Sequence, residues 1–153
     1  MLNFLKKKPE SFFSTEEKQT IVHAIQQAET NTNGEIRVYI ENRCKHTDTV
    51  FRAEKIFRKL NMYNTENRNG VLVYMAVKDK KLAVYGDKGI YEKAGIEFWE
   101  ESVQQMIQHF NKNNFSKGIA EVVLKIGNAL KQHFPYNNGT DINELPDDIV
   151  FGK

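Results

Sequence analysis

Two apolar runs joined by a short charged turn constrain the fold of this chain more than any other feature. The first run starts at Val71, the turn occupies residues 78–81, and the second run ends at Gly86. Two strands with so tight a connection pair antiparallel, so the end of the second strand returns beside the start of the first. Asp87 follows the second run and is therefore predicted to lie next to residues 67–69 at one end of a sheet.

A strand-helix-strand unit is predicted before and into this hairpin. Residues 35–41 alternate apolar and polar side chains, which predicts a strand with one buried face and one exposed face. A helical pattern follows a cap at Thr47 or Asp48 and leads to the first strand of the hairpin. Such a crossover normally makes the two strands parallel, so Glu35 should lie at the same end of the sheet as Asp87.

Three further helices are predicted outside this unit. Ser14 and Glu17 have the spacing of a capping box, so a helix is expected to begin there and to end near Glu29, where turn residues follow. Large apolar residues recur at helical spacing in residues 98–110 and again in residues 115–134. The sequence thus combines helices and strands in an α/β arrangement.

Composition excludes several classes of protein. Lys and Arg number 22 against 20 Asp and Glu, so the chain lacks the basic field on which nucleic-acid binding depends. No apolar stretch reaches a membrane-spanning length, and the single cysteine, Cys44, cannot form an internal disulfide. We expect a soluble, monomeric, cytoplasmic protein.

The chain is expected to form one domain over residues 13–136. Residues 1–12 are predicted to be a flexible N-terminal segment. Residues 137–153 interleave acidic and apolar side chains without the spacing of a helix-loop-helix calcium loop. They are predicted to form a C-terminal arm that docks on the domain.

Asp87 is the leading candidate for a functional side chain. It stands between Gly86 and Gly89, where the backbone can turn sharply and the carboxylate can project. Such a solvent-accessible carboxylate at a strand end suits a cation or a polar ligand better than it suits a core. The alternative is a solvated turn aspartate that only caps its loop, and residue type alone leaves both interpretations open.

Five short motifs, taken in order, resemble the TPM-domain family over about residues 13–136. They are Gly34-Glu-Ile-Arg-Val38, Arg68-Asn-Gly-Val-Leu72, Gly86-Asp-Lys-Gly-Ile90, Phe98-Trp-Glu100 and Phe134-Pro135. The resemblance implies a three-layer, Rossmann-like α/β/α sandwich with a small mixed central sheet of three to four strands. Because the sequence pattern predicts only three strands, a fourth should be short and lie near the crossover or in the tail.

The resemblance also implies a function. Members of the family are associated with divalent metals at loops that cross at one end of the sheet. Relatives in chloroplast thylakoids are linked to photosystem II repair and to a weak acid phosphatase activity.

On this basis the carboxylates near the predicted sheet end become candidate metal ligands. Asp87 and Glu35 are the leading ligands, Glu92 and Glu100 support them, and Asn69 can supply a carbonyl oxygen. Oxygen ligands favour calcium or magnesium, and the lack of a histidine or thiol cluster disfavours zinc and copper. Glu100 could instead stabilise the amino end of its helix.

Three functions remain open at this point. The first is a module whose bound divalent cation orders two loops and so controls binding of an unidentified protein partner. The second is a weak metal-dependent phosphatase in which Asp87 is ligand or nucleophile and Arg68 or Lys88 balances phosphate charge. The third is an interaction scaffold that is indifferent to metal. The first is preferred, because no nucleophile paired with a general acid can be named.

Overall fold

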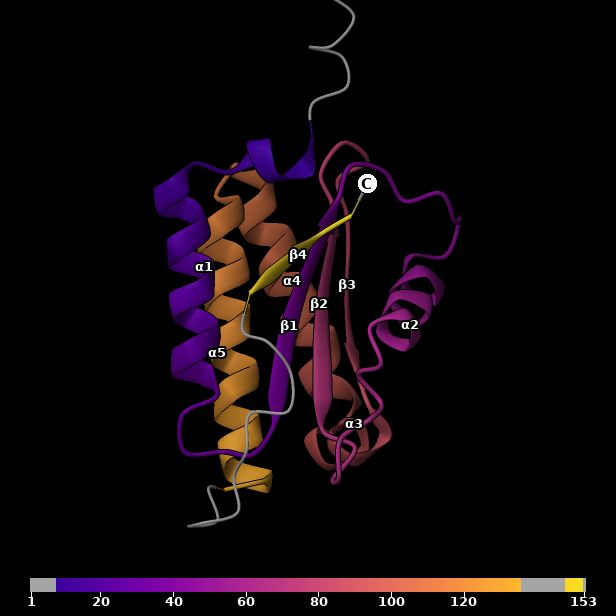
Figure 1. Cartoon of the computed structure of the whole chain (residues 1–153), viewed down its shortest axis with the longest axis vertical. Coiled ribbons are helices and arrows are strands. Elements are labelled where there is room, and N and C mark those ends of the chain that lie inside the picture. The colour runs from indigo at the N-terminus through magenta and orange to yellow at the C-terminus, as the bar shows by residue number, and fades with distance from the viewer. Residues whose placement is uncertain (1–7, 136–147, 153) are drawn as a thin grey trace, which may run out of the picture.

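The computed structural model describes residues 8–135 and 148–152 and has the three-layer α/β/α architecture that the sequence predicts (Figure 1). In chain order the described elements are η2 (Pro9–Phe12), α1 (Thr15–Ala28), β1 (Glu35–Glu41), α2 (Thr49–Lys59), β2 (Gly70–Ala76), β3 (Lys81–Gly86), α3 (Lys88–Ala94), α4 (Ile96–Asn111), α5 (Phe115–His133) and β4 (Ile149–Phe151).

The sheet is mixed and has the strand order β3-β2-β1-β4. β1 and β2 are parallel with Glu35 opposite Gly70, and β3 runs antiparallel to β2 with Gly86 opposite Val71. β4 pairs in parallel with the end of β1. The fourth strand therefore comes from the C-terminal tail, one of the two places where the sequence predicts it.

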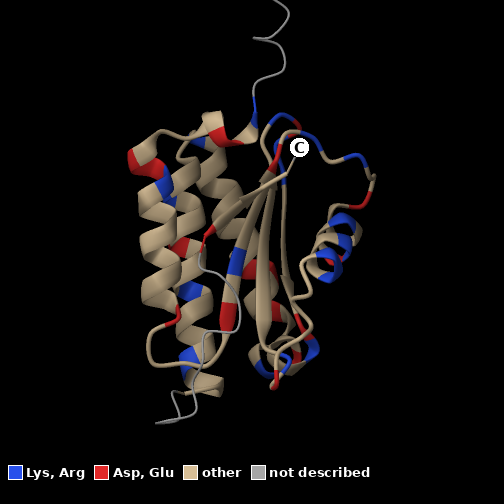
Figure 2. Cartoon of the chain, viewed as in Figure 1, with Lys and Arg blue, Asp and Glu red and all other residues tan. Residues whose placement is uncertain are grey.

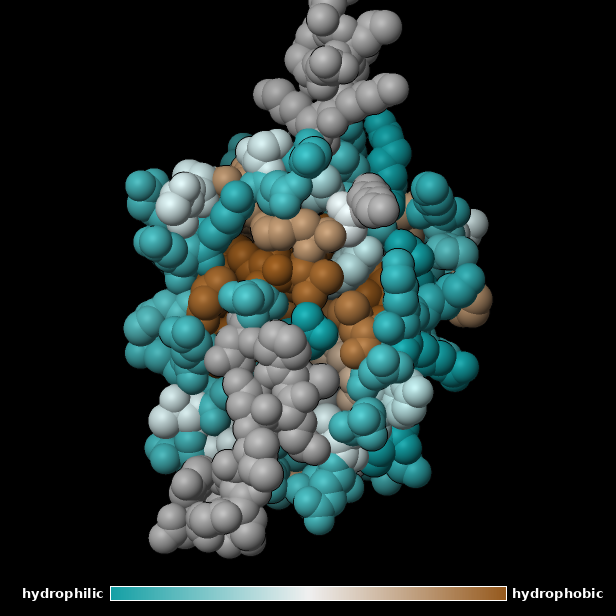
Figure 3. All heavy atoms as spheres, in the orientation of Figure 1, coloured by the Kyte–Doolittle hydropathy of each residue, from teal (hydrophilic) through white to brown (hydrophobic). Residues whose placement is uncertain are grey.

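The two faces of the sheet are covered unequally. α1, α4 and α5 pack on one face around Ile36, Val73 and Met106. Among the described helices, α2 is the one that covers the other face, around Phe57 and Tyr74. Figure 3 shows apolar surface in the middle of the viewed face, where β4 runs between α1 and β1. The side chains of β4 are only partly buried, which is consistent with a short strand at the sheet edge.

The prediction that β1 has an exposed face is wrong. Glu35, Tyr39 and Glu41 are buried although they alternate with the apolar residues. Towards the end of β1 the reason is α2, which packs against the same cluster as Tyr39 and bonds to Glu41 through Arg52. Val50 and Phe51, at the start of α2, are exposed.

Helix boundaries largely agree with the sequence pattern, but α3 was not expected. Ser14 and Glu17 form the predicted capping box, and Asp48 caps α2. The sequence pattern predicts no helix directly after Asp87, whereas Lys88–Ala94 form α3. α3 is only seven residues long, contains a glycine and buries a single residue, Ile90, so it lacks the apolar period that reveals a helix.

The termini also refine the predicted domain limits. Pro9–Phe12 form η2, and the ring of Phe12 lies 5.0 Å from Phe13 and 5.1 Å from Phe115. The ordered domain therefore starts before residue 13. The rest of the predicted flexible segment and most of the predicted arm lie outside the described residues. None of the helices within residues 8–135 is long and apolar enough to cross a membrane.

A close contact between α1 and α5 gives a test of this packing. A Cβ added at Gly127 would lie 2.6 Å from the Cα of Ala28, so Gly127→Ala should force the helices apart and lower the free energy of unfolding by about 1–3 kcal/mol. Helix propensity alone predicts a gain of about 1 kcal/mol. Asn128→Ala, at an exposed neighbouring site, is the control. Urea unfolding followed by circular dichroism measures both, and a stabilised Gly127→Ala protein would contradict the packing.

Candidate functional site

Asp87 lies where β3 ends and α3 begins. Its backbone N–H donates to the carbonyl oxygen of Gly70 at 2.9 Å, which ties it to the start of β2. Its carboxylate accepts from the N–H of Lys88 at 2.8 Å and so caps α3. Only 4% of Asp87 is exposed, so it is neither the solvated turn residue nor the accessible loop carboxylate considered from the sequence.

Arg68 forms a bidentate ion pair with Asp87. Nε of Arg68 lies 2.6 Å from Oδ2 of Asp87, and Nη2 lies 2.9 Å from Oδ1. The hydrogen bonds to Asp87 raise the pKa of Arg68 above its ordinary value. Arg68 adopts φ 50°, in the left-handed region that a branched or long side chain seldom occupies. The backbone strain at this position is offset by a charge-assisted pair of hydrogen bonds.

Two chain segments cross beside this ion pair. The N–H of Gly89 donates to the carbonyl oxygen of Arg68 at 2.9 Å. A Cβ at Gly89 would lie 2.1 Å from the carbonyl oxygen of Asn67, so only glycine permits the approach. The carbonyl oxygens of Asn67 and Arg68 therefore lie against Gly89, two residues after Asp87. Carbonyl and carboxylate oxygens are the groups that bind hard cations.

A groove of about 730 Å³ runs from this crossing along β3, between α2 and the α3–α4 pair. Figure 2 shows acidic and basic residues close together around α3. The groove is lined by Arg68, Val84, Tyr85, Asp87, Lys88, Tyr91, Glu92, Ile96, Trp99, Glu100 and Val103, with Val50 contributed by α2.

The structure brings three of the predicted ligands into this groove. Asp87 lies at its end, and Glu92 and Glu100 line its wall with their side chains exposed. Lys88 and Arg68, the predicted phosphate contacts, line it too. No three His, Cys, Asp or Glu side chains of the described residues are close enough to hold one ion.

Glu35 and Asn69 lie at the same sheet end but outside the groove lining. Glu35 of β1 pairs with Gly70 of β2, and Asp87 bonds to Gly70 from the other side. The Glu35 and Asp87 backbones are therefore two strand spacings apart, about 10 Å in total. Asn69 is buried and donates from Nδ2 to Oδ1 of Asn33 at 2.9 Å. Its own Oδ1 has no hydrogen-bond partner among the described residues.

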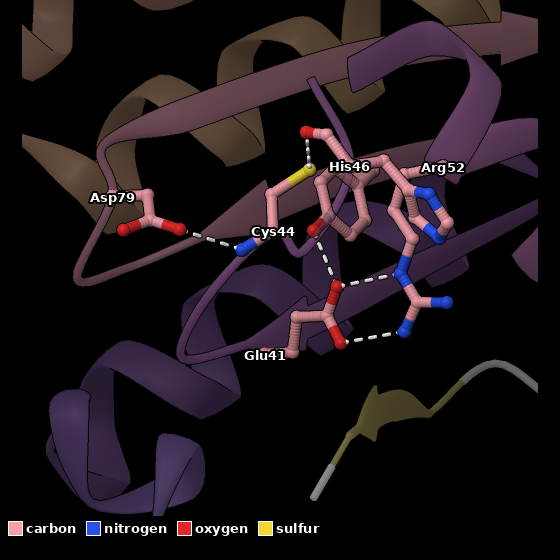
Figure 4. Close-up of polar contacts among 6 residues, drawn as sticks. Glu41, Cys44, His46, Arg52 and Asp79 are labelled. Carbon is pink, nitrogen blue, oxygen red and sulfur yellow. Dashed lines mark hydrogen bonds and ion pairs between the residues drawn. The ribbon is translucent and has the colours of Figure 1, made fainter. Parts of the chain in front are cut away.

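A second polar cluster occupies the opposite end of the sheet (Figure 4). The buried carboxylate of Glu41 accepts hydrogen bonds at 2.9 and 2.8 Å from Nε and Nη2 of Arg52 on α2, and it also accepts from the hydroxyl of Tyr74. Burial, followed by this hydrogen bond, raises the pKa of Tyr74. Nearby, the Cys44 N–H donates to Asp79 at 2.7 Å.

The sequence interpretation missed this cluster because it placed Glu41 on an exposed face. A usable signal was nevertheless present. Glu41 ends a strand predicted to be parallel to its neighbour, and Arg52 follows in the first turns of the crossover helix. A crossover helix packs back on the sheet that its strands form. An acid at the end of the first strand and a base near the start of the helix can therefore meet.

Comparisons with known proteins define the family. The chain matches the TPM domain over residues 7–129 and therefore belongs to the TPM-domain family. The NMR structure of BA42 protein from the psychrophilic bacterium Bizionia argentinensis is similar, with 42% identity and a TM-score of 0.83 over 91% of this chain and 94% of that one. A search of curated proteins gives no match.

Two more distant structures share the fold alone. The N-terminal domain of a P. gingivalis protein has 17% identity and a TM-score of 0.68, covering 82% of this chain and 83% of that one. The N-terminal domain of cg2496 protein from Corynebacterium glutamicum has 9% identity and a TM-score of 0.63, covering 86% and 81%. The α/β/α frame is thus retained when little of the sequence is.

The Glu41 cluster should be a stability element. Glu41→Gln leaves the half-buried guanidinium of Arg52 without its counter-charge and should lower the free energy of unfolding by about 3 kcal/mol. Glu54→Gln is the matched control, because it removes another Glu–Arg pair of α2 whose arginine is 72% exposed, and it should cost about 0.5 kcal/mol. Equal losses by urea unfolding would contradict the difference between the two pairs.

Proposed function

We propose that this TPM domain is a binding module whose ligand is a divalent cation, calcium or magnesium. The cation binds where residues 67–68 cross the start of α3. The observation that supports this site is the buried carboxylate of Asp87 beside the carbonyl oxygens at the crossing. A carboxylate held among carbonyl groups at a tight turn matches the oxygen chemistry of hard cations.

The ligand set follows from the groove lining. Asp87 supplies the anchoring carboxylate, and Glu92 or Glu100, which are exposed and can rotate, supplies a second. The carbonyl oxygen of Asn67 and water complete the six to eight oxygens that calcium takes. Glu35, about two strands away, adds negative charge to this end of the sheet without sharing the ion.

Arg68 competes with the cation for Asp87. Its guanidinium already holds both carboxylate oxygens. A bound cation displaces Arg68 and frees its side chain toward the groove. Cation binding thereby changes the order of the crossing loops, and through them the binding of a protein partner.

The phosphatase alternative rests on Arg68 and Lys88, two cationic residues in the groove. They can bind a phosphate group, but hydrolysis also requires a positioned nucleophile and a proton donor. Asp87 is a poor nucleophile while its two oxygens are held by Arg68. We therefore rank the binding module first, and we place it in the cytoplasm, in keeping with the free thiol of Cys44.

The cation proposal predicts stabilisation by ligand. A cation that binds only the folded protein, at about ten times its Kd, adds about 1.4 kcal/mol and raises the melting temperature by about 4 °C. Thermal unfolding in calcium, in magnesium and in chelator at matched ionic strength measures this shift. A melting temperature that stays constant up to millimolar calcium would remove the proposal.

Two substitutions at the ion pair predict opposite effects on cation affinity. Asp87→Asn removes the anchor and should weaken calcium binding about tenfold. Arg68→Gln removes the arginine that competes for Asp87. Because the ion pair is worth about 1 kcal/mol, its loss should tighten calcium binding about fivefold. Isothermal titration calorimetry and amide NMR report both changes, and each variant is compared at a temperature where it is folded.

Asp79→Asn is the matched control for these substitutions. Asp79 also pairs with an arginine, Arg43, at 2.8 Å, but at the opposite end of the sheet. Its substitution should leave calcium affinity unchanged, and an equal loss in both aspartate variants would show non-specific binding. Turnover of a phosphate ester that is lost in both Asp87→Asn and Arg68→Gln would instead put the enzyme first.

A further inference from the structure

β3 is an edge strand, and its outer edge faces the groove. The sheet order places β2 on one side of β3, and none of the described strands lies on the other side (Figure 1). The groove is lined by Val84, Tyr85 and Gly86 of this strand. An uncovered edge presents unpaired N–H and C=O groups to which another strand can bond.

The phase of the ladder identifies these groups. Hydrogen-bonded and non-hydrogen-bonded pairs alternate in an antiparallel ladder. The bond from the Asp87 N–H to Gly70 makes that pair hydrogen-bonded, so the pair of Val84 with Val73, three residues along, is not. Val84 therefore directs its N–H and C=O away from β2. The free backbone groups point into the groove that runs beside the strand.

The walls of the groove suit the side chains of an added strand. Such a strand projects alternate side chains to the two faces of the sheet. On one face they meet Trp99, Val103 and Ile96 of α4, and on the other they meet Tyr85 and Val50. Ile96 is 62% exposed and Val50 is 53% exposed, so docking removes apolar surface from water.

Glu100 is the one charged residue that α4 contributes to the groove lining, and it specifies the chemistry of the occupant. Glu100 projects from α4 beside Trp99 and has no ion-pair partner among the described residues. Next to an apolar wall, it favours a Lys or Arg side chain on the same face of the docked strand as the apolar residues.

We propose that the β3 groove binds an extended segment of a partner protein by strand addition. The segment carries apolar residues at alternate positions and a Lys or Arg that pairs with Glu100. Its backbone bonds to Val84 and its apolar side chains lie on Trp99 and Val103. This inference goes beyond the cation site and does not require a bound cation, because the backbone and apolar contacts lie along β3 and α4. Glu100 is the one residue that both proposals use, and chelator therefore keeps the two tests apart.

A synthetic peptide tests the proposal. Acetyl-Val-Thr-Val-Thr-Arg-Thr-amide places two valines and the arginine on one face, and it is titrated into the isotope-labelled full chain in the presence of chelator. Saturable amide shifts are expected at Val84 and Gly86, together with a shift of the Trp99 indole. Because chelator is present, failure of the cation proposal leaves this result unaffected. No saturable shift at millimolar peptide would overturn the docking proposal.

A second peptide separates strand addition from adhesion to an apolar surface. A peptide N-methylated at alternate residues keeps its side chains but loses backbone donors, and it should bind about tenfold more weakly. Equal binding of both peptides would overturn strand addition.

The contact between Glu100 and the peptide arginine is tested by exchanging the two charges. Glu100→Arg should lose affinity for the arginine peptide and bind the version with glutamate in its place, whereas Glu97→Arg, exposed on the same helix outside the groove lining, should keep the original preference. A preference unchanged by Glu100→Arg would overturn the assignment of Glu100.

Discussion

The ion pair between Arg68 and Asp87 holds together the part of the molecule where three segments meet. Asp87 ties the end of β3 to the start of β2 through its backbone and caps α3 through its carboxylate. Arg68 lies in the connection from α2 to β2 and is held in a left-handed conformation. Because both charges are satisfied by each other, a mostly buried carboxylate is tolerated without a bound ion. Under the proposed function, the same pairing means that a cation has to compete with an arginine for Asp87.

The placement of this site follows from topology, which explains why much of it could be predicted from sequence. A tight turn fixed β2 and β3 as antiparallel, and a helical crossover fixed β1 and β2 as parallel. Together these two constraints put Glu35 and Asp87 at one sheet end. They do not set the distance across intervening strands, and so they could not show that β2 separates the two carboxylates.

Other features depended on tertiary contacts that no local pattern encodes. β1 alternates like a half-exposed strand, but α2 lies over its polar face and buries Glu41 against Arg52. α3 has too few apolar residues to show a helical period, and it forms because Asp87 caps it and Ile90 enters the core. In both cases the deciding partner is distant in sequence or contributes only one side chain, so periodicity carries no signal.

The polar groups at the two ends of the sheet are arranged differently. At one end Glu41, Arg52 and Tyr74 satisfy one another in a buried cluster, which leaves little capacity for an external ligand. At the other end Asp87 caps α3, and Tyr91 of α3 stacks on Trp99 of α4, with 5.8 Å between ring centroids. Trp99 also donates from its indole to the carbonyl oxygen of Tyr91 at 3.0 Å. One short helix therefore connects Asp87 to the wall of the groove beside β3.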